Sequence, residues 1–192
     1  PIKEEYLLTG PLEPTNEWYA IAKIAGIRLC QAYRKQHGLN FICGMPTNLY
    51  GPGDNFDLHT SHVLPALIRK IHEALTTGAK EVVLWGTGTP RREFLYVDDC
   101  ADACLFLMDQ YSEPAPINIG AASDLTIREL ADAVQQVIGW QGTFVQDTSK
   151  PDGTPLKKLD TTRLSELGWQ QSVALSTGIE RTYASFTASL MQ

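Results

Sequence analysis

The chain has 192 residues, a length that normally forms one domain or one domain with a small appendage. Hydrophobic residues make up 43% and charged residues 20%, so a sizeable core is available and wholesale disorder is excluded. Its 16 basic residues are outnumbered by 22 acidic ones, which gives a net charge of −6. That balance argues against a nucleic-acid-binding protein, so an anionic ligand would depend on a few well-placed cations.

The four cysteines show neither a metal-ligand pattern nor a disulfide framework. Cys100 and Cys104 lie one helical turn apart, and we expect both to be buried thiols of a reduced, cytoplasmic protein. The longest apolar stretch, 104–108, is far too short to cross a bilayer, and no signal peptide opens the chain. We therefore expect no metal site and no membrane partner. A first residue of Pro1 is typical of a piece of a longer protein.

Short apolar runs alternate with helical periods along the chain, which favours an α/β protein. In chain order the sequence predicts a loop (1–15), a helix (16–37), a buried strand (41–45), a turn-rich loop (48–57), a helix (61–77), two strands (81–85 and 92–96), a helix (98–111), a strand (117–119), a helix (126–138), a strand (143–146), a polar loop (147–158) and two closing helices.

In several helices the sequence indicates where the helix begins or ends and which side faces the core. Asn16 can cap the first helix and Gly38 can end it, while Thr126 and Glu129 have the spacing of a capping box. The side of the first helix predicted to face inward holds Trp18, Ile21, Ala22, Ala25 and Leu29. The inward side of the helix over 61–77 holds Val63, Leu64, Leu67, Ile68, Ile71 and Leu75.

Tyr19 and Lys23 stand four residues apart in the first helix and therefore lie on the same face. A nearby ammonium favours the phenolate form of a tyrosine, which makes the hydroxyl usable in acid/base catalysis near neutral pH. On spacing alone, a chance pair on a helix surface is the more common explanation.

Two later blocks change that balance. The helix is followed by Pro-Thr-Asn-Leu-Tyr-Gly-Pro at 46–52 and by Arg-Glu-Phe-Leu-Tyr-Val-Asp-Asp at 92–99. In this order the three blocks resemble the extended short-chain dehydrogenase/reductase family, whose members act on nucleotide sugars. The runs at 12–17, 20–23, 45–52, 61–67 and 149–155 are similar to the branch that epimerises GDP-4-keto-6-deoxy-D-mannose at C3 and C5 and reduces it at C4 with NADPH. The similarity extends over essentially the whole sequence.

The resemblance implies an α/β fold made of the C-terminal part of a Rossmann-type doubly wound parallel sheet and a smaller α/β substrate-binding domain. The NADP-binding part would cover 1–55 and the GDP-sugar part mainly 56–192, with 97–120 returning to the Rossmann sheet. The family's Gly-rich cofactor turn does not occur in these residues, because Gly86-Thr87-Gly88 falls between two predicted strands. The resemblance therefore implies a C-terminal fragment, inactive by itself, of an enzyme that forms a homodimer.

The resemblance also assigns catalytic and cofactor roles. Tyr19 would give a proton to the C4 oxygen, and Lys23 would assist it and bind the nicotinamide ribose. His62 would be the acid in the epimerisation, a role that suits imidazole because its pKa lies near working pH. The residues implied to contact NADP(H) are Lys23, Pro46, Thr47, Asn48, Leu49 and His62.

Four further positions match the substrate contacts of the family. Lys70 and Arg92 would supply charge for the pyrophosphate, Trp85 an aromatic wall and Asp152 an acceptor for the GDP-sugar. Lys70 stands where relatives often have Arg, which keeps the charge but loses the bidentate fork. Two alternatives remain open at this stage: another nucleotide-sugar epimerase or dehydratase of the same superfamily, and a non-catalytic sugar-nucleotide binding module.

Overall fold

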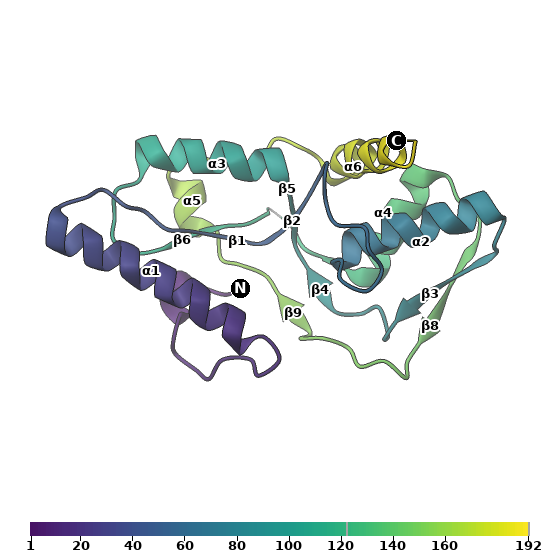
Figure 1. The fold of residues 1–192 in the computed structure, drawn as a ribbon, viewed down its shortest axis with the longest axis horizontal. Helices are drawn as coiled ribbons and strands as arrows, with labels where there is room; N and C mark the ends of the chain where they lie inside the picture. The colour runs from purple at the N-terminus through teal and green to yellow at the C-terminus, as the bar shows by residue number, and fades with distance from the viewer. Residues whose placement is uncertain (122, 192) are drawn as a thin grey trace.

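The computed structural model describes residues 1–121 and 123–191 (Figure 1). The expected α/β class is confirmed, since helices alternate with short strands along the chain. The elements are, in chain order, η1 (Glu4–Tyr6), α1 (Glu17–His37), β1 (Gly44–Pro46), β2 (Asn48–Tyr50), α2 (Val63–Thr77), β3 (Glu81–Trp85), β4 (Arg91–Arg92), β5 (Phe94–Tyr96), α3 (Val97–Gln110), β6 (Ile117–Ile119), β7 (Leu125–Thr126), α4 (Ile127–Ile138), β8 (Thr143–Asp147), β9 (Leu156–Lys157), α5 (Thr162–Glu166) and α6 (Leu175–Ser189).

The described strands form four small sheets, three of them parallel pairs. β1 pairs with β6, β2 with β5 and β3 with β8, all in parallel, while β4 lies between antiparallel β7 and parallel β9. The β1–β6 pair places Pro46 opposite Ile119, and the β2–β5 pair places Asn48 opposite Phe94. The polar segment expected over 147–158 therefore contains a strand, β9, which holds that segment beside β4.

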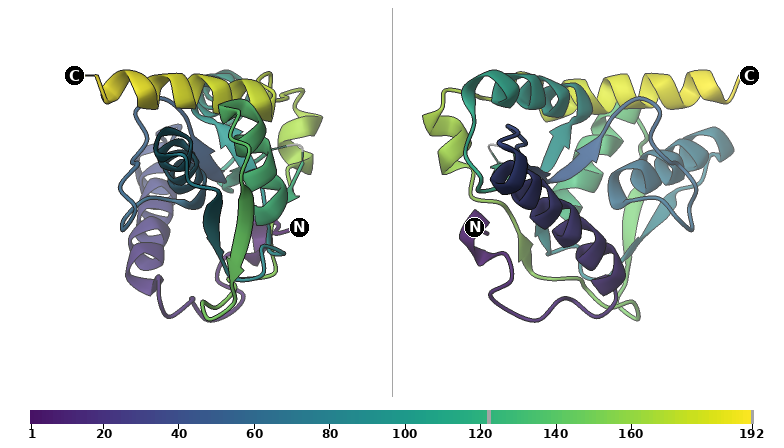
Figure 2. Two further views of the ribbon diagram at one scale, coloured as in Figure 1. Left: turned by 90° about the vertical axis from the view of Figure 1, so that its right-hand side faces the viewer. Right: turned by 60° about the vertical axis from the view of Figure 1, so that its left-hand side comes forward.

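Two hydrophobic clusters lie side by side and meet at β5. One cluster joins α2, β3, α4 and α6 and includes Phe94 and Tyr96; the other joins α3, β6 and α5 and includes Leu95. Successive strand side chains point to opposite faces, so this one strand serves both clusters. In Figure 1 the helices α3 and α6 run along one edge of the molecule, above the two halves, and both views of Figure 2 show α6 along that edge with α1 below it.

The helices with strong sequence signals form as expected. Leu64, Leu67, Ile68 and Ile71 of α2 are buried, although Leu75 is 41% exposed. At the start of α4, the Thr126 hydroxyl accepts a hydrogen bond from the Glu129 N–H and the Glu129 side chain accepts one from the Thr126 N–H, which confirms the capping box.

The first helix departs from its predicted facing. None of its residues is buried, and Trp18, Ile21 and Leu29 are 78%, 49% and 58% exposed. Asn16 stands at the N-cap position but its side chain makes no capping hydrogen bond, whereas Gly38 ends the helix with a φ of +66° as expected. The strand predicted as buried over 41–45 is shifted to Gly44–Pro46 and is not buried. An apolar run or stripe in the sequence identifies residues that are able to pack, but it does not show which element covers them. Both wrong burial predictions, for α1 and for the strand after it, have this cause.

The cysteine prediction is correct for Cys100, which is buried, and wrong for Cys104, which is exposed on the next turn of α3. Burial raises the pKa of the Cys100 thiol to about 11. Within residues 1–121 and 123–191, no helix is both long and apolar enough to span a membrane. No group of acidic, cysteine and histidine side chains in these same ranges has the arrangement of a metal site.

Candidate active site

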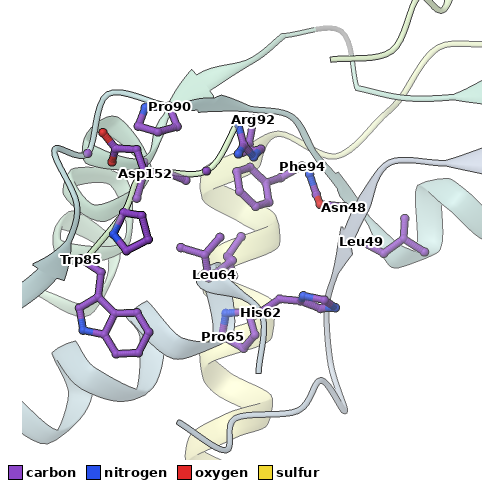
Figure 3. Close-up of a pocket in the computed structure, with 15 residues that line it drawn as sticks. Asn48, Leu49, His62, Leu64, Pro65, Trp85, Pro90, Arg92, Phe94 and Asp152 are labelled. Carbon is purple, nitrogen blue, oxygen red and sulfur yellow. The ribbon is translucent and has the colours of Figure 1, made fainter. Parts of the chain in front are cut away.

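Two cavities meet at a common wall between the two halves of the molecule. One, of about 570 Å³, is lined by Asn16, Tyr19, Pro46, Thr47, Asn48, Leu49, His62, Glu93, Lys157 and Leu159. The other, of about 240 Å³, is lined by Asn48, Leu49 and His62 together with Trp85, Arg92, Asp152 and their neighbours (Figure 3). Tyr19, His62 and the predicted cofactor segment 46–49 thus line one cavity, Trp85, Arg92 and Asp152 line the other, and Asn48, Leu49 and His62 border both.

The common wall is built where short parallel strands end. β1 stops at Pro46, and the Thr47 N–H donates to the Ile119 carbonyl at 2.9 Å, which ties this exit to the end of β6. The Asn48 amide donates to the backbone carbonyl of Glu93 at 2.9 Å. Ligands of open α/β sheets bind beyond the C-terminal ends of parallel strands, and Pro46 and Thr47, at the end of β1, occupy such a position.

Tyr19 lies in the first turn of α1 and lines the larger cavity. Its ring is approached by the ammonium of Lys23, whose Nζ lies 5.3 Å from the ring centroid. The predicted pairing of the two side chains on one helix face is therefore present. Lys23 is exposed and is not among the residues that line either cavity, and Tyr19 is itself 60% exposed.

His62 is the residue immediately before α2 and lines both cavities. His62 is the N-cap residue of α2: its backbone is extended, and its carbonyl accepts a hydrogen bond from the Ala66 N–H. Its side chain makes no capping hydrogen bond, so the ring can point away from the helix. Figure 3 shows the ring directed away from Trp85, toward the side where Asn48 and Leu49 lie. Burial raises the pKa of nearby Asp54, and the charge of His62 opposes that shift.

Trp85 ends β3 with a 62% exposed ring at the mouth of the smaller cavity. Lysines approach it from two segments: Nζ of Lys70 lies 5.1 Å and Nζ of Lys150 lies 5.7 Å from its ring centroid. Lys70 also donates to the Val83 carbonyl at 3.4 Å, and burial lowers its pKa. Lys70 thus reaches the site through Trp85 without lining the cavity, and Lys150 is a cation that the sequence analysis did not select.

Arg92 and Asp152 hold the loop that closes the smaller cavity. Nη1 of Arg92 donates to the Thr154 carbonyl at 2.6 Å and to the Arg91 carbonyl at 2.7 Å, and burial lowers the pKa of its guanidinium. The Asp152 carboxylate accepts hydrogen bonds from Thr87. Gly86 has a φ of +75°, and a Cβ there would lie 2.2 Å from Oδ1 of Asp152. This turn therefore needs glycine for both its conformation and its close approach to Asp152.

Glu93 lines the larger cavity and was not among the site residues predicted from the sequence. It stands between Arg92 and β5, is 0% exposed, and accepts hydrogen bonds from distant backbone N–H groups. The block Arg-Glu-Phe-Leu-Tyr carries no local signal for such a role, because its partners lie 28 and 66 residues away.

A family model described as the NAD dependent epimerase/dehydratase family matches residues 1–120. GDP-L-fucose synthase 1 of Arabidopsis thaliana is 61% identical over 183 residues, a match that covers 95% of this chain and 57% of that enzyme. GDP-L-fucose synthase of Escherichia coli (strain K12) is 52% identical over 195 residues, covering 97% of this chain and 61% of that enzyme.

Solved structures give a similar picture. A GDP-L-fucose synthetase from Naegleria fowleri bound to NADP matches with a TM-score of 0.93 at 32% identity, covering 100% of this chain and 62% of that chain. The chain thus spans less than two thirds of the length of each of these relatives.

Proposed function

Because the chain belongs to the NAD dependent epimerase/dehydratase family, we propose that the whole protein is a GDP-L-fucose synthase. Such an enzyme converts GDP-4-keto-6-deoxy-D-mannose to GDP-L-fucose by inverting C3 and C5 and reducing C4 with NADPH. The similarity to enzymes of that name supports this choice over other nucleotide-sugar epimerases and dehydratases. The observation that carries the proposal is the common wall of Asn48, Leu49 and His62 between the two cavities.

The residues around the larger cavity fit the nicotinamide end of NADP(H). Pro46, Thr47, Asn48, Leu49 and His62 line it beside Tyr19, and the cavity of about 570 Å³ has room for a ring and a ribose. Lys23, on the next turn of α1, would bind the ribose. When bound, NADPH supplies the hydride that reduces the C4 ketone.

Tyr19 is proposed to complete the reduction. Its hydroxyl donates a proton to the C4 oxygen, which would otherwise carry a full negative charge after reduction. The Lys23 ammonium, 5.3 Å from the Tyr19 ring centroid, stabilises the phenolate left behind. The proton on Tyr19 is then restored from solvent, because the ring is 60% exposed.

His62 is proposed to be the acid in the epimerisation of the two carbons that flank the ketone. The C4 ketone makes the C3–H and C5–H bonds acidic, because loss of either proton gives an enolate stabilised by the carbonyl. Protonation of that enolate from the opposite face of the ring inverts the carbon. Inversion therefore needs a base that takes the first proton and an acid on the other face that gives the second. The position of His62 beside both the cavity of Tyr19 and the cavity of Trp85 supports the role of that acid.

The GDP end of the substrate is assigned to the smaller cavity. Trp85 offers an aromatic face, and Arg92 and Lys70 offer charge for the pyrophosphate, while Asp152 shapes the loop. Arg92→Ala should weaken GDP binding by about 1.5–3 kcal/mol, the scale of a charge-assisted hydrogen bond. Calorimetric titration of GDP measures this, with Arg28→Ala, an exposed arginine of α1 paired with Gln31, as the matched control. Equal affinity of wild type and Arg92→Ala would remove Arg92 from the site.

We further propose that residues 1–55 and 97–120 belong to the NADP-binding part and the remainder mainly to the GDP-sugar part. The separate hydrophobic clusters on either side of β5 support this division. A cytoplasmic homodimer is proposed as the working form, with the exposed apolar face of α1 as its contact. Exposed Trp18, Ile21 and Leu29 support it, since such faces mark interaction sites.

The function is tested by incubating the whole protein with NADPH and GDP-4-keto-6-deoxy-D-mannose. We expect loss of nicotinamide absorbance and formation of GDP-L-fucose. A reduced product that keeps the D-manno configuration would indicate a different nucleotide-sugar reductase. Binding of GDP without consumption of NADPH would indicate a non-catalytic binding module.

A further inference from the structure

Glu93 joins three segments that are far apart in the sequence. Its Oε2 accepts from the Ala121 N–H at 3.1 Å and its Oε1 from the Leu159 N–H at 2.8 Å. The Thr47 side chain also hydrogen-bonds to the carboxylate, and the Glu93 backbone carbonyl accepts from the Asn48 amide. One residue thus fixes the 47–48 segment, the exit of β6 and the exit of β9 against one another.

The setting of this carboxylate is tightly packed. Glu93 is 0% exposed, and a Cβ at Gly120 would lie 2.9 Å from its Oε2 and 2.8 Å from Cγ2 of Thr161. Only glycine therefore lets the exit of β6 pass so close to the carboxylate. Burial raises the pKa of Glu93, while the hydrogen bonds from Leu159, Thr47 and Ala121 and the charge of Lys158 oppose that shift.

A buried carboxylate held by converging donors needs a reason beyond stability, because an apolar side chain would avoid its desolvation. The location gives the reason. Glu93 lines the larger cavity, and so do two residues that its carboxylate holds, Thr47 through its side chain and Leu159 through its backbone N–H. The side chain is therefore built into the wall that faces Tyr19.

We propose that Glu93 is a positioning residue that holds the Thr47–Asn48 segment so that NADPH presents its nicotinamide to the substrate beside Tyr19. This inference rests on the function proposed above. Glu93 acts through Thr47 and the neighbouring backbone and is not assigned a contact with the reacting atoms. A gap of about 1 Å in such placement is enough to slow a reaction by about 10²-fold.

The decisive variant is Glu93→Gln in the whole protein. It keeps the side-chain shape, but the amide offers one oxygen and turns an NH₂ group toward a donor, so one buried N–H loses its acceptor. Asp99→Asn is the matched control. Asp99 is 4% exposed and accepts from the Ser172 N–H, the Ser172 hydroxyl and the Val173 N–H, all away from the two cavities.

The measurements are the melting temperature, the Kd of NADPH by nicotinamide fluorescence, the Kd of GDP, and the rate of hydride transfer. For Glu93→Gln we expect an NADPH Kd raised and a hydride-transfer rate lowered by about 10- to 100-fold, with GDP affinity unchanged. Asp99→Asn should lower the melting temperature and leave both affinities and the rate as in wild type. If Glu93→Gln does not fold, Glu93→Asp is used instead, because it keeps the charge but withdraws the oxygens. It should likewise weaken NADPH binding and slow hydride transfer while GDP affinity stays unchanged.

The outcomes separate the two proposals. Wild-type affinity for NADPH and a wild-type rate in Glu93→Gln would overturn the positioning role and leave the proposed function intact. If Glu93→Gln and Asp99→Asn both lost NADPH affinity and rate in proportion to their fall in melting temperature, the positioning role would also be overturned and Glu93 would be structural. A wild-type protein that binds NADPH but forms no GDP-L-fucose would overturn the proposed function, while the NADPH Kd of the variants still decides the role of Glu93. A wild-type protein that does not bind NADPH would overturn both.

Discussion

The Asp152 carboxylate accepts two hydrogen bonds from Thr87, one from the backbone N–H at 2.9 Å and one from the hydroxyl at 2.7 Å. These two hydrogen bonds join the turn after β3 to the loop between β8 and β9. Thr87 and Asp152 are 65 residues apart in the chain. Asp152 was expected to accept a hydrogen bond from the substrate, and in this structure Thr87 occupies both of its oxygens. We therefore expect Asp152 to anchor the loop that closes the smaller cavity.

Thr87→Val tests this anchor without removing the charge of Asp152. We expect Thr87→Val and Asp152→Asn each to weaken GDP binding by about fivefold, equivalent to about 1 kcal/mol for one hydrogen bond. The double variant should be little weaker than either single variant, because both remove the same contact. Calorimetric titration of GDP into the variants measures this. Unchanged or tighter binding in Thr87→Val would show instead that Asp152 serves the ligand directly.

Tyr19→Phe in the whole protein should abolish reduction while leaving GDP and NADPH affinities as in wild type. The change removes one hydroxyl and keeps the ring against which Lys23 packs, so the cavity retains its shape. Loss of a general acid costs about 10²–10⁴ in rate. Single-turnover oxidation of NADPH measures the effect, and Tyr33→Phe, on the same helix but lining neither cavity, is the control. Affinity falling as far as rate would make Tyr19 structural.

His62→Asn should separate epimerisation from reduction. If His62 moves protons at C3 and C5, the variant should incorporate solvent deuterium at these carbons about 10²-fold more slowly or worse. Reduction of an already epimerised 4-keto intermediate should be less affected. Nuclear magnetic resonance of the sugar follows both steps, with exposed His59→Asn as control. Normal exchange with failed reduction would reassign His62 to placing the cofactor.

The ion pairs of Asp124 should make the folding stability of the chain fall at acid pH. Side-chain hydrogen bonds from Lys158 and Arg91 lower its pKa from 3.8 to about 2. Because the folded value lies below the unfolded one, the stabilisation is complete above about pH 4 and is lost as pH falls toward about 2. Urea unfolding of the 192-residue chain should show wild type more stable than Asp124→Asn near neutral pH, with the difference shrinking across that window. Asp132→Asn, which loses an exposed ion pair with Arg128, should show little difference at any pH. A difference between wild type and Asp124→Asn that stays constant from pH 5 to 2 would contradict the assignment.

The features that were predicted correctly from the sequence depend on residues close together in the chain. The Thr126–Glu129 capping box and the apolar stripe of α2 involve residues three or four apart, and both form as expected. The Tyr19–Lys23 contact has the same short range and is also present. Nothing in the sequence around Glu93 identifies it as a hub, because its donors come from the ends of other strands.

Burial was the least predictable property, for a related reason. The stripe of α1 is as apolar in sequence as a packed helix needs, yet Trp18 is 78% exposed. Cys104 lies one turn after buried Cys100, but it faces away from the cluster of α3 and β6. Periodicity states which side chains share a face, and only the positions of other elements decide whether that face is covered.

The isotopic composition of the product tests most directly whether one site carries out both inversion and reduction, as proposed. The whole protein is incubated in D₂O with NADPH and GDP-4-keto-6-deoxy-D-mannose, and the product is examined by nuclear magnetic resonance. We expect GDP-L-fucose with deuterium at C3 and C5 and the hydrogen of NADPH at C4. A product with hydrogen retained at C3 and C5, or none at all while both GDP and NADPH bind, would contradict it.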